Sequence, residues 1–183
     1  VRSKPLPAPA PDVDAEFAAG SATPVSTTMV FTRILRNLIR DKEPEEFERV
    51  WSTKVDGALA LLRHAPKDAA LVLMASISGA VGNQGQADYG AANDALDTLA
   101  HSARGRTVCS IDWGPWAGGG MVSPELEREY ERRGVGLVPV EAGVSLVCDQ
   151  VAAGLPHRQL MFVRAEPAAI GAVEASPVTT GPV

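Results

Sequence analysis

Four polar residues stand where the surrounding pattern favours apolar side chains or where a strand ends. Tyr89 and Asn93 are four residues apart and therefore share one face of the helix predicted over 86–103. Lys54 lies on the apolar stripe of an earlier helix, where an unused charge would be costly. Ser76 closes a buried strand at its carboxyl end, the edge where open α/β sheets bind ligands. Hydroxyl and ammonium groups at such an edge can donate hydrogen bonds and protons to an oxygen of a ligand.

Each of these residues also has a purely structural explanation. The Lys54 side chain could extend along its helix into solvent. Tyr89 and Asn93 could satisfy each other's hydrogen bonds inside the core, and Ser76 could be a turn residue. Judged one at a time, the four residues leave both explanations open.

The hydrophobic pattern predicts helices and strands in alternation. Pro44 suits a helix start, and apolar residues then recur at helical spacing as far as 64–66. The apolar run at 70–75 fits a strand that is buried on both faces. The other predicted elements are a glycine-rich loop at 76–85, strands at 107–113 and 159–164, and helices at 29–39, 86–103, 123–133 and 140–153. This alternation predicts an α/β fold with a mainly parallel sheet and helices on both faces.

One folded unit is expected between two irregular ends. The chain has 183 residues, 45% of them hydrophobic, which is enough for one domain with a core. Five prolines among small and polar residues identify 1–24 as a disordered linker. A mixture of Pro, Ala, Val and Thr without periodicity makes 165–183 a flexible tail, so 25–164 remain as the folded domain.

Composition argues against several classes of function. A formal net charge of -5 and the lack of any run of basic residues argue against nucleic-acid binding. No apolar run approaches the roughly 20 residues of a membrane span, so we expect a soluble, cytoplasmic protein without membrane contact. Cys109 and Cys148 lie in apolar stretches and are expected to be buried, reduced thiols. The histidines lack the spacing of metal ligands, and no metal site is predicted.

Taken together, several segments resemble a known family. LMASISGAVGNQGQADYGAANDALDTLA at 73–100 resembles the active-site segment of the ketoreductase domains of type I polyketide and fatty-acid synthases, which are short-chain dehydrogenase/reductases. Ser76 stands 13 residues before Tyr89, as in that family. STKVDGA at 52–58 is similar to the lysine helix of these domains, and DWGPW at 112–116 to their cofactor-contact turn. The segments GGMVSPEL and RGVGLVPVEAG then follow in the order typical of iterative polyketide and polyunsaturated-fatty-acid synthases.

The resemblance implies a reaction and a role for each residue. Ketoreductase domains use NADPH to reduce a β-ketoacyl group on an acyl carrier protein to a β-hydroxyacyl group. On this basis Tyr89 donates the proton, Ser76 hydrogen-bonds the carbonyl oxygen, and Lys54 stabilises the phenolate and contacts the nicotinamide ribose. Asn93 stands where ordinary short-chain dehydrogenases carry lysine and is implied to hold a water or proton path. The other implied roles are cofactor contact by Tyr89, Lys54, Gly114, Pro115 and Trp116, and a substrate lid that includes Met121 and Val122.

The phosphate-binding half of a dinucleotide fold is not evident in the sequence. No GxGxxG is present, and about three strands are predicted where a doubly wound fold uses about six. The chain therefore resembles the C-terminal, catalytic portion of the domain, with a partial Rossmann-like sheet. We expect it to require the N-terminal ketoreductase half or other synthase domains as partners. Alone, it should bind NADPH weakly and self-associate as a homo-oligomer, because one sheet edge is left uncovered.

Other interpretations remain open. The chain could be a truncated, non-catalytic ketoreductase remnant that serves as a scaffold, or a small-molecule binding module without redox chemistry. Gly79, Gly82 and Gly85 could form a dinucleotide fingerprint that ends at Asp112, although their GxxGxxG spacing differs from the usual one. Product stereochemistry is not predicted, because Val81 stands where one product class of the family carries tryptophan, and 35–37 read Leu-Arg-Asn where the other carries leucine–aspartate–aspartate.

Overall fold

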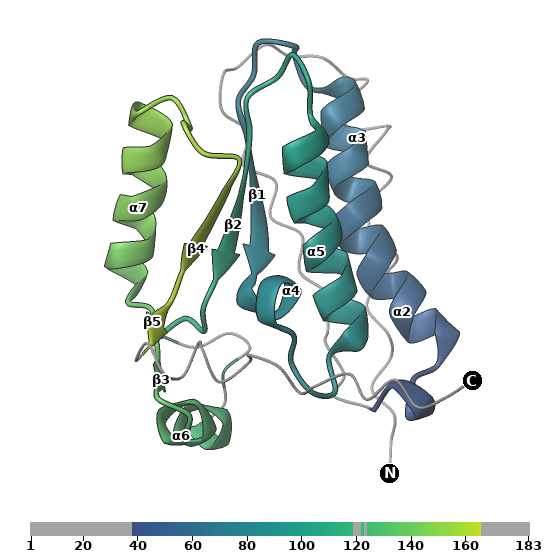
Figure 1. Ribbon diagram of the computed structural model, residues 1–183, viewed down its shortest axis with the longest axis vertical. Helices are drawn as coiled ribbons and strands as arrows, with labels where there is room; N and C mark the ends of the chain where they lie inside the picture. Colours follow the sequence, from purple (N-terminus) through teal and green to yellow (C-terminus); the bar gives the residue numbers. More distant parts are fainter. Residues whose placement is uncertain (1–37, 119–121, 123, 166–183) are drawn as a thin grey trace, which may run out of the picture.

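A computed structural model of the chain describes residues 38–118, 122 and 124–165 (Figure 1). The linker predicted over 1–24 lies outside this part of the chain, as do Met121, all but the first residue of the predicted tail, and the helix predicted over 29–39 apart from its last two residues. The described elements are η1 (Ile39–Asp41), α2 (Pro44–Trp51), the π-helical segment η2 (Ser52–Asp56), α3 (Gly57–His64), β1 (Leu71–Ser76), α4 (Ile77–Val81), α5 (Ala87–Ser102), β2 (Val108–Trp113), α6 (Pro124–Arg132), β3 (Val135–Gly136), α7 (Val140–Ala152), β4 (Gln159–Phe162) and β5 (Arg164–Ala165).

Strands β1, β2 and β4 form a parallel sheet in the order β1-β2-β4. Helices α2, α3 and α5 lie on one face of this sheet and α7 lies on the other (Figure 1). In the register of the sheet, Ser76 stands beside Trp113, which in turn stands beside Phe162. The predicted α/β architecture, with a parallel sheet and helices on both faces, is therefore confirmed.

Strand β2 is buried along its whole length and sends alternate side chains to opposite faces. Cys109, Ile111 and Trp113 form a hydrophobic cluster with residues of α7 and β4. On the opposite face, Val108 packs with residues of α5, and Ser110 donates a hydrogen bond to a carboxylate on the same helix. The period of two along β2 thus decides which of its polar side chains meet α5.

The long helical segment predicted from Pro44 onwards is present, but its middle is not α-helical. Pro44 occupies the first turn of α2, where its missing N–H costs nothing. Residues 52–56 then adopt the wider π-helical turn, which is frequent at functional sites. Val50 and Val55 are both buried although five residues apart, as the i→i+5 spacing of a π turn allows. This turn carries Lys54.

The prediction of a glycine-rich loop over 76–85 is wrong for the first half of this range, because residues 77–81 form the short helix α4. Ser76 is its N-cap, and the Ser76 hydroxyl accepts a hydrogen bond from the backbone N–H of Ser78 at 3.3 Å. Gly79 allows α4 to lie directly on α5, since a Cβ at this position would be 2.7 Å from the backbone nitrogen of Asp94. The Ser-Gly composition that indicated a loop here serves helix capping and close helix packing.

The strand predicted over 159–164 is also two elements. Strand β4 ends at Phe162, and β5 then pairs antiparallel with β3 so that Gly136 stands opposite Arg164. This short antiparallel pair lies with α6 at the carboxyl end of the parallel sheet (Figure 1). The short strands β3 and β5 carry no alternating pattern long enough to be recognised in the sequence.

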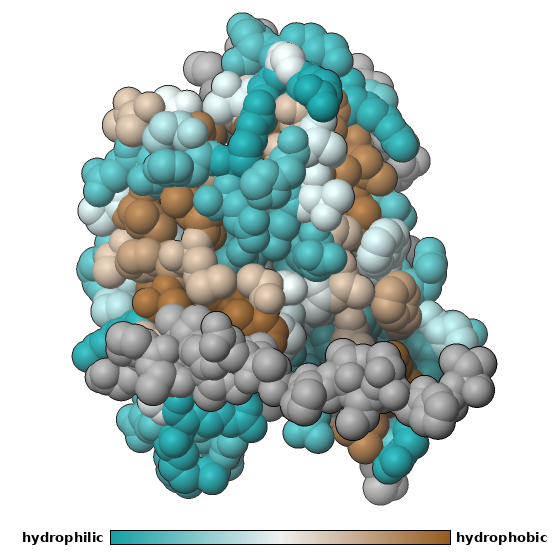
Figure 2. Space-filling model, in the orientation of Figure 1, coloured by the Kyte–Doolittle hydropathy of each residue, from teal (hydrophilic) through white to brown (hydrophobic). Residues whose placement is uncertain are grey.

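Two further observations concern the surface. Cys148 is exposed, which corrects the prediction that both thiols are buried, whereas Cys109 is buried as predicted. Helix α6 has no buried residue and presents a mainly hydrophilic surface (Figure 2). In the described part of the chain, no helix is both long enough and apolar enough to cross a membrane.

Candidate active site at the carboxyl end of the sheet

The structure places Lys54 against Tyr89. The Lys54 ammonium donates a hydrogen bond to the backbone oxygen of Met74 in β1 at 3.0 Å. The same Nζ lies 5.4 Å from the centroid of the Tyr89 ring, within the range of a cation–π contact. Burial lowers the pKa of Lys54 from its ordinary value of 10.5 to about 8. The side chain is therefore mostly charged at pH 7 but close to its titration range.

Tyr89 is the third residue of α5 and is half-buried. Burial raises the pKa of its phenol above the ordinary value of 10.0. The nearby polar side chains of Ser76 and Asn93 act in the opposite direction, and the Tyr130 phenol of α6 adds a smaller upward contribution. The phenol is consequently neutral at pH 7 and carries the proton that a general acid needs.

Ser76 is held at the end of β1 by a neighbouring serine that the sequence interpretation missed. The Ser78 hydroxyl, which is buried, donates a hydrogen bond to the Ser76 hydroxyl at 3.0 Å. Because the Ser76 oxygen accepts both this bond and the Ser78 N–H bond, its own proton remains to be donated elsewhere. The pattern Ser-x-Ser at a strand end was the only available signal for Ser78.

Asn93 is completely buried one turn after Tyr89. Its Nδ2 donates to the backbone oxygen of Tyr89 at 2.6 Å. Its Oδ1 has no hydrogen-bond partner among the described residues. A buried acceptor of this kind can bind a further donor beside the tyrosine.

The predicted cofactor-contact turn follows β2, next to the end of β1. Gly114 is buried, and a Cβ there would lie 3.1 Å from a methyl carbon of Val163, so the glycine is needed for packing against the chain that follows β4. The Trp116 ring packs closely on α7, since a Cβ on Gly143 would be 2.3 Å from this ring. The centroids of the Trp116 and Trp113 rings are 4.6 Å apart. The aromatic side chain of this turn is therefore occupied in packing.

Pro115 is tied to the chain after β3 through its backbone. Its carbonyl accepts a hydrogen bond from the N–H of Val138 at 2.7 Å, and Val138 is buried. The Gly114 N–H likewise donates to the backbone oxygen of Phe162 at 2.9 Å, so hydrogen bonds within the fold fix the path of this turn at the sheet edge. Of the two predicted lid residues, Val122 is half-buried, and Met121 lies outside the described residues.

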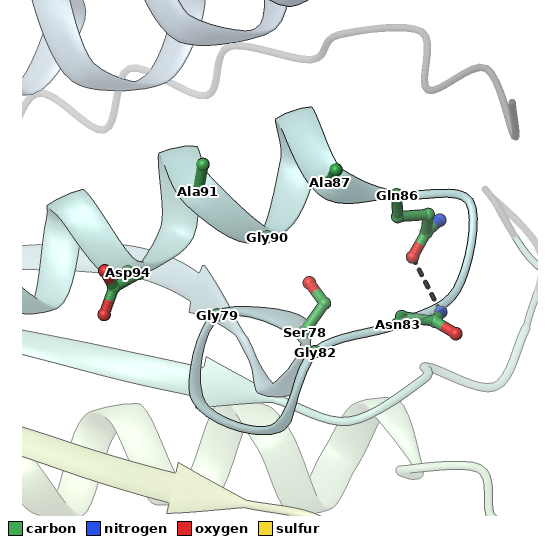
Figure 3. A pocket seen from close by; sticks show the side chains of 9 residues that line it. All are labelled: Ser78, Gly79, Gly82, Asn83, Gln86, Ala87, Gly90, Ala91 and Asp94. Atoms are coloured by element: carbon green, nitrogen blue, oxygen red, sulfur yellow. Dashed lines mark hydrogen bonds between the residues drawn. The ribbon is translucent and has the colours of Figure 1, made fainter. Parts of the chain in front are cut away.

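A shallow hollow of about 270 Å³ lies between α4 and the start of α5 (Figure 3). Its lining residues are Ser78, Gly79, Gly82, Asn83, Gln86, Ala87, Gly90, Ala91 and Asp94. Neither Tyr89 nor Lys54 lines this hollow. Gly79, one of the three glycines that could have formed a dinucleotide fingerprint, packs against α5 here. This packing gives Gly79 a structural role that does not depend on phosphate binding.

A second polar cluster lies deeper between α5 and the sheet. The Asp97 carboxylate accepts a hydrogen bond from Ser110 at 2.5 Å, and the Asp112 carboxylate accepts one from Gln159 at 2.8 Å. Burial is the main cause that raises the pKa of both carboxyl groups, that of Asp112 to about 6. His101 contacts Gln159 at 3.0 Å on the outer side. This cluster lacks any lysine or arginine among the residues described.

The chain is similar to a known family and to curated proteins. The family model described as "KR domain" matches residues 24–118. One component of the polyunsaturated fatty acid synthase from Thraustochytrium sp. is 41% identical over 133 residues, which are 70% of this chain and 5% of that protein. A pikromycin polyketide synthase component of Streptomyces venezuelae is 38% identical over 128 residues, which are 67% of this chain and 8% of that protein.

Solved structures agree with the family model. The first ketoreductase of the tylosin polyketide synthase superposes with a TM-score of 0.70 at 33% identity, covering 88% of this chain and 38% of that one. The ketoreductase from the first module of phoslactomycin biosynthesis in Streptomyces sp. HK803 gives a TM-score of 0.67 at 34% identity, covering 79% and 34%. The chain thus spans about a third of these solved ketoreductases. Because the family model covers more than half of the sequence and these folds agree, this chain belongs to the KR domain family, as a C-terminal portion of a ketoreductase of the polyketide and polyunsaturated-fatty-acid synthase type.

Proposed function

We propose that this chain is the catalytic portion of an NADPH-dependent ketoreductase. Its substrate is a β-ketoacyl group on an acyl carrier protein, and its product is the β-hydroxyacyl group, within a polyketide or fatty-acid synthase. The observation that carries this proposal is the Lys54 ammonium placed 5.4 Å from the Tyr89 ring centroid, with Ser76 and Asn93 beside the phenol. A non-catalytic remnant would have no use for an ammonium that burial destabilises, so the geometry favours an enzyme.

Each of these side chains then has a chemical task. Tyr89 is neutral at pH 7 and donates its proton to the substrate oxygen as negative charge develops there. Ser76 donates a hydrogen bond to the same oxygen, because Ser78 already supplies the hydrogen bond that its own oxygen accepts. The Lys54 ammonium stabilises the phenolate that remains after proton donation. Asn93 offers its Oδ1 to a water that passes a proton back to Tyr89.

The described residues fit the nicotinamide end of the cofactor. Lys54 uses one N–H on Met74 and retains donors for ribose hydroxyls, and the backbone of Gly114, Pro115 and Trp116 lies at the same sheet edge. NADPH, when bound, supplies the hydride. The phosphate end has no glycine-rich turn in this sequence, so the N-terminal half of the domain or another synthase segment provides it.

Substitution of Tyr89 tests the assignment. In a synthase assembly that contains this chain, Tyr89→Phe should lower β-ketoacyl reduction by about 10²–10⁴-fold, because it removes the proton donor. NADPH binding, followed by fluorescence titration, should change little. Tyr130→Phe removes the other tyrosine hydroxyl of the chain, which makes only the smallest contribution to the Tyr89 pKa, and it should change reduction far less than Tyr89→Phe does. Reduction that survives Tyr89→Phe within about tenfold would show that Tyr89 is not the acid.

A cofactor titration tests the proposed division of the domain. The purified chain should bind NADPH weakly and should associate with itself or with a partner, because β1 has a neighbour on only one side in the described sheet. Addition of an N-terminal ketoreductase half should tighten binding. Tight NADPH binding by the chain as a monomer would contradict this expectation.

A further inference from the structure

Lys42 and Asp88 form an ion pair that belongs to none of the roles assigned above. The Lys42 Nζ lies 2.9 Å from the Asp88 Oδ1, and the two side chains are 4% and 1% exposed. Both charges are thus almost entirely removed from water. The other ion pairs found in the described parts of the chain involve side chains that are 29% exposed or more.

The Asp88 carboxylate is also bonded to the backbone of the proposed proton donor. Its Oδ1 accepts a hydrogen bond from the Tyr89 N–H at 2.9 Å, so one oxygen joins the Lys42 ammonium to the Tyr89 backbone. Asp88 lies in the first turn of α5, where a negative charge is favoured by the helix dipole. Its Oδ2 has no hydrogen-bond partner among the described residues.

Lys42 stands at the other helix of the site. It lies two residues before Pro44, where α2 begins, and α2 continues directly into the π turn that carries Lys54. The ion pair therefore joins the start of the helix that positions Lys54 to the start of the helix that positions Tyr89. The cluster between α2 and α5 is apolar and includes Val50 and Trp51 of α2 and Ala92 of α5.

Apolar contacts are non-directional, whereas a buried ion pair requires its two charged groups to stay in contact. Removal of one partner leaves an uncompensated buried charge and is strongly destabilising, whereas replacement of both partners by neutral groups is often neutral for stability. A buried pair is thus a weak source of stability and a strong constraint on geometry. Its position between the two functional helices indicates what it constrains.

We propose that Lys42 and Asp88 are positioning residues, whose ion pair fixes the start of α2 against the start of α5 and so holds the Lys54 ammonium against the Tyr89 ring. The proposal rests on the function proposed above for Lys54 and Tyr89. Neither Lys42 nor Asp88 touches substrate or cofactor in this arrangement. They act on the reaction only through the placement of the other two side chains.

The titration of Lys54 reports this placement without any measurement of activity. Lysine labelled with ¹³C at Cε allows the four lysines of the chain to be followed by NMR as the pH changes, and a Lys54→Met sample assigns the relevant signal. In the unchanged chain Lys54 should titrate near pH 8, because burial lowers its pKa. Lys42→Met, Asp88→Asn and the double variant should each raise this pKa toward 10.5, since a displaced Lys54 becomes hydrated.

The signs separate positioning from simple electrostatics. If the pair acted on Lys54 only through its charges, Lys42→Met would raise the Lys54 pKa, Asp88→Asn would lower it, and the double variant would leave it near 8. That pattern, or no change in any variant, would overturn the proposal. The double variant removes both charges of the pair together and decides the question even where a single variant does not fold.

Asp41→Asn is the matched control, because Asp41 adjoins Lys42 but is 59% exposed and pairs with Arg40 at the surface. It should leave the titration of Lys54 unchanged. In the complete synthase, the double variant should lower kcat about tenfold or more with little change in KM. If the Tyr89→Phe test fails while the Lys54 titration shifts as expected, the positioning role stands and only the reductase assignment falls.

Discussion

One face of α5 carries two buried polar clusters that differ in charge. Tyr89, Asn93 and Asp97 follow each other at intervals of four residues and therefore share this face. In the cluster at the start of the helix, the ammonium of Lys54 lies against the Tyr89 ring. Asp88, the residue before Tyr89, forms an ion pair with Lys42. The cluster further along combines Asp97 with a second carboxyl group and neutral donors.

The charges and positions of the two clusters distinguish a functional cluster from a structural one. The first cluster holds charges of both signs at the carboxyl end of the sheet: the Lys54 ammonium lies against the Tyr89 ring, and the Lys42–Asp88 pair is almost entirely buried beside it. The second is enclosed between α5, β2 and β4, and burial raises the pKa of both of its carboxyl groups. Buried polarity alone is therefore a weak sign of a site. Opposite charges at strand ends are a stronger one.

Removal of the Lys54 charge should have the largest effect, because it removes the ammonium that distinguishes the first cluster from the second. Lys54→Met should lower turnover in the synthase by about 10²-fold or more, because the Tyr89 phenolate loses its counter-charge. The same change should stabilise the fold at pH 7 by about 1 kcal/mol, since a partly buried charge disappears. Steady-state kinetics and thermal unfolding measure the two effects.

The stability gain has a defined pH window. The folded-state pKa of Lys54 lies below its unfolded value, so the native chain is penalised below about pH 8 and relieved between about 8 and 10.5. The advantage of Lys54→Met should therefore vanish above pH 10.5. Lys67→Met, at an exposed position, is the control and should change neither property. A destabilised Lys54→Met variant with normal turnover would remove the distinction between the clusters.

The reaction rate should also depend on pH through the same lysine. As pH rises above about 8, Lys54 loses its proton, and turnover for ketone reduction should fall by up to tenfold for each pH unit. The residual activity of Lys54→Met should not show this decline. A profile that stays flat to pH 10 in the unchanged enzyme would mean that the ammonium is not required.

Much of this arrangement could be predicted from sequence because it depends on local spacing. A four-residue interval places Tyr89 and Asn93 on one helix face, and the apolar run before Ser76 locates a strand end. The order of the motifs then brought Lys54 into the same group. The placement of Tyr89, Asn93 and Ser76 needs only the periodicity of single elements and the rule that parallel strands end at one edge, whereas the grouping of Lys54 with them rests on the resemblance to ketoreductase domains.

The remaining features depend on contacts between distant segments. Nothing near Lys42 indicates that its partner is Asp88 on another helix, so the ion pair was not predicted. The helix α4 was interpreted as loop because its glycine content reflects close packing on α5, which sequence spacing does not reveal. The acidic cluster was missed for the same reason, since Asp97 and Asp112 meet only when α5 lies on β2.

The smallest expected effect is a change in stability caused by a substitution in the second cluster. Asp112→Asn replaces one of two adjacent buried carboxyl groups by an amide, whose oxygen can still accept the hydrogen bond from Gln159 and whose N–H can donate to Asp97. At pH 8 this should stabilise the chain by about 1–2 kcal/mol, as measured by urea unfolding. The sign follows from the raised pKa of Asp112, because the native carboxyl group prefers its neutral form.

The pH dependence provides the decisive check. The stability that the Asp112 carboxyl group contributes is fully present below its unfolded pKa of about 3.8 and is lost as pH rises through its folded pKa of about 6. The advantage of Asp112→Asn should therefore be large at pH 8 and nearly absent at pH 4. Asp68→Asn changes the same chemical group at an exposed position and should show no such difference. If Asp112→Asn instead destabilises the chain at pH 8, the ionised carboxylate is needed for the fold, and both clusters on α5 would then depend on buried charge.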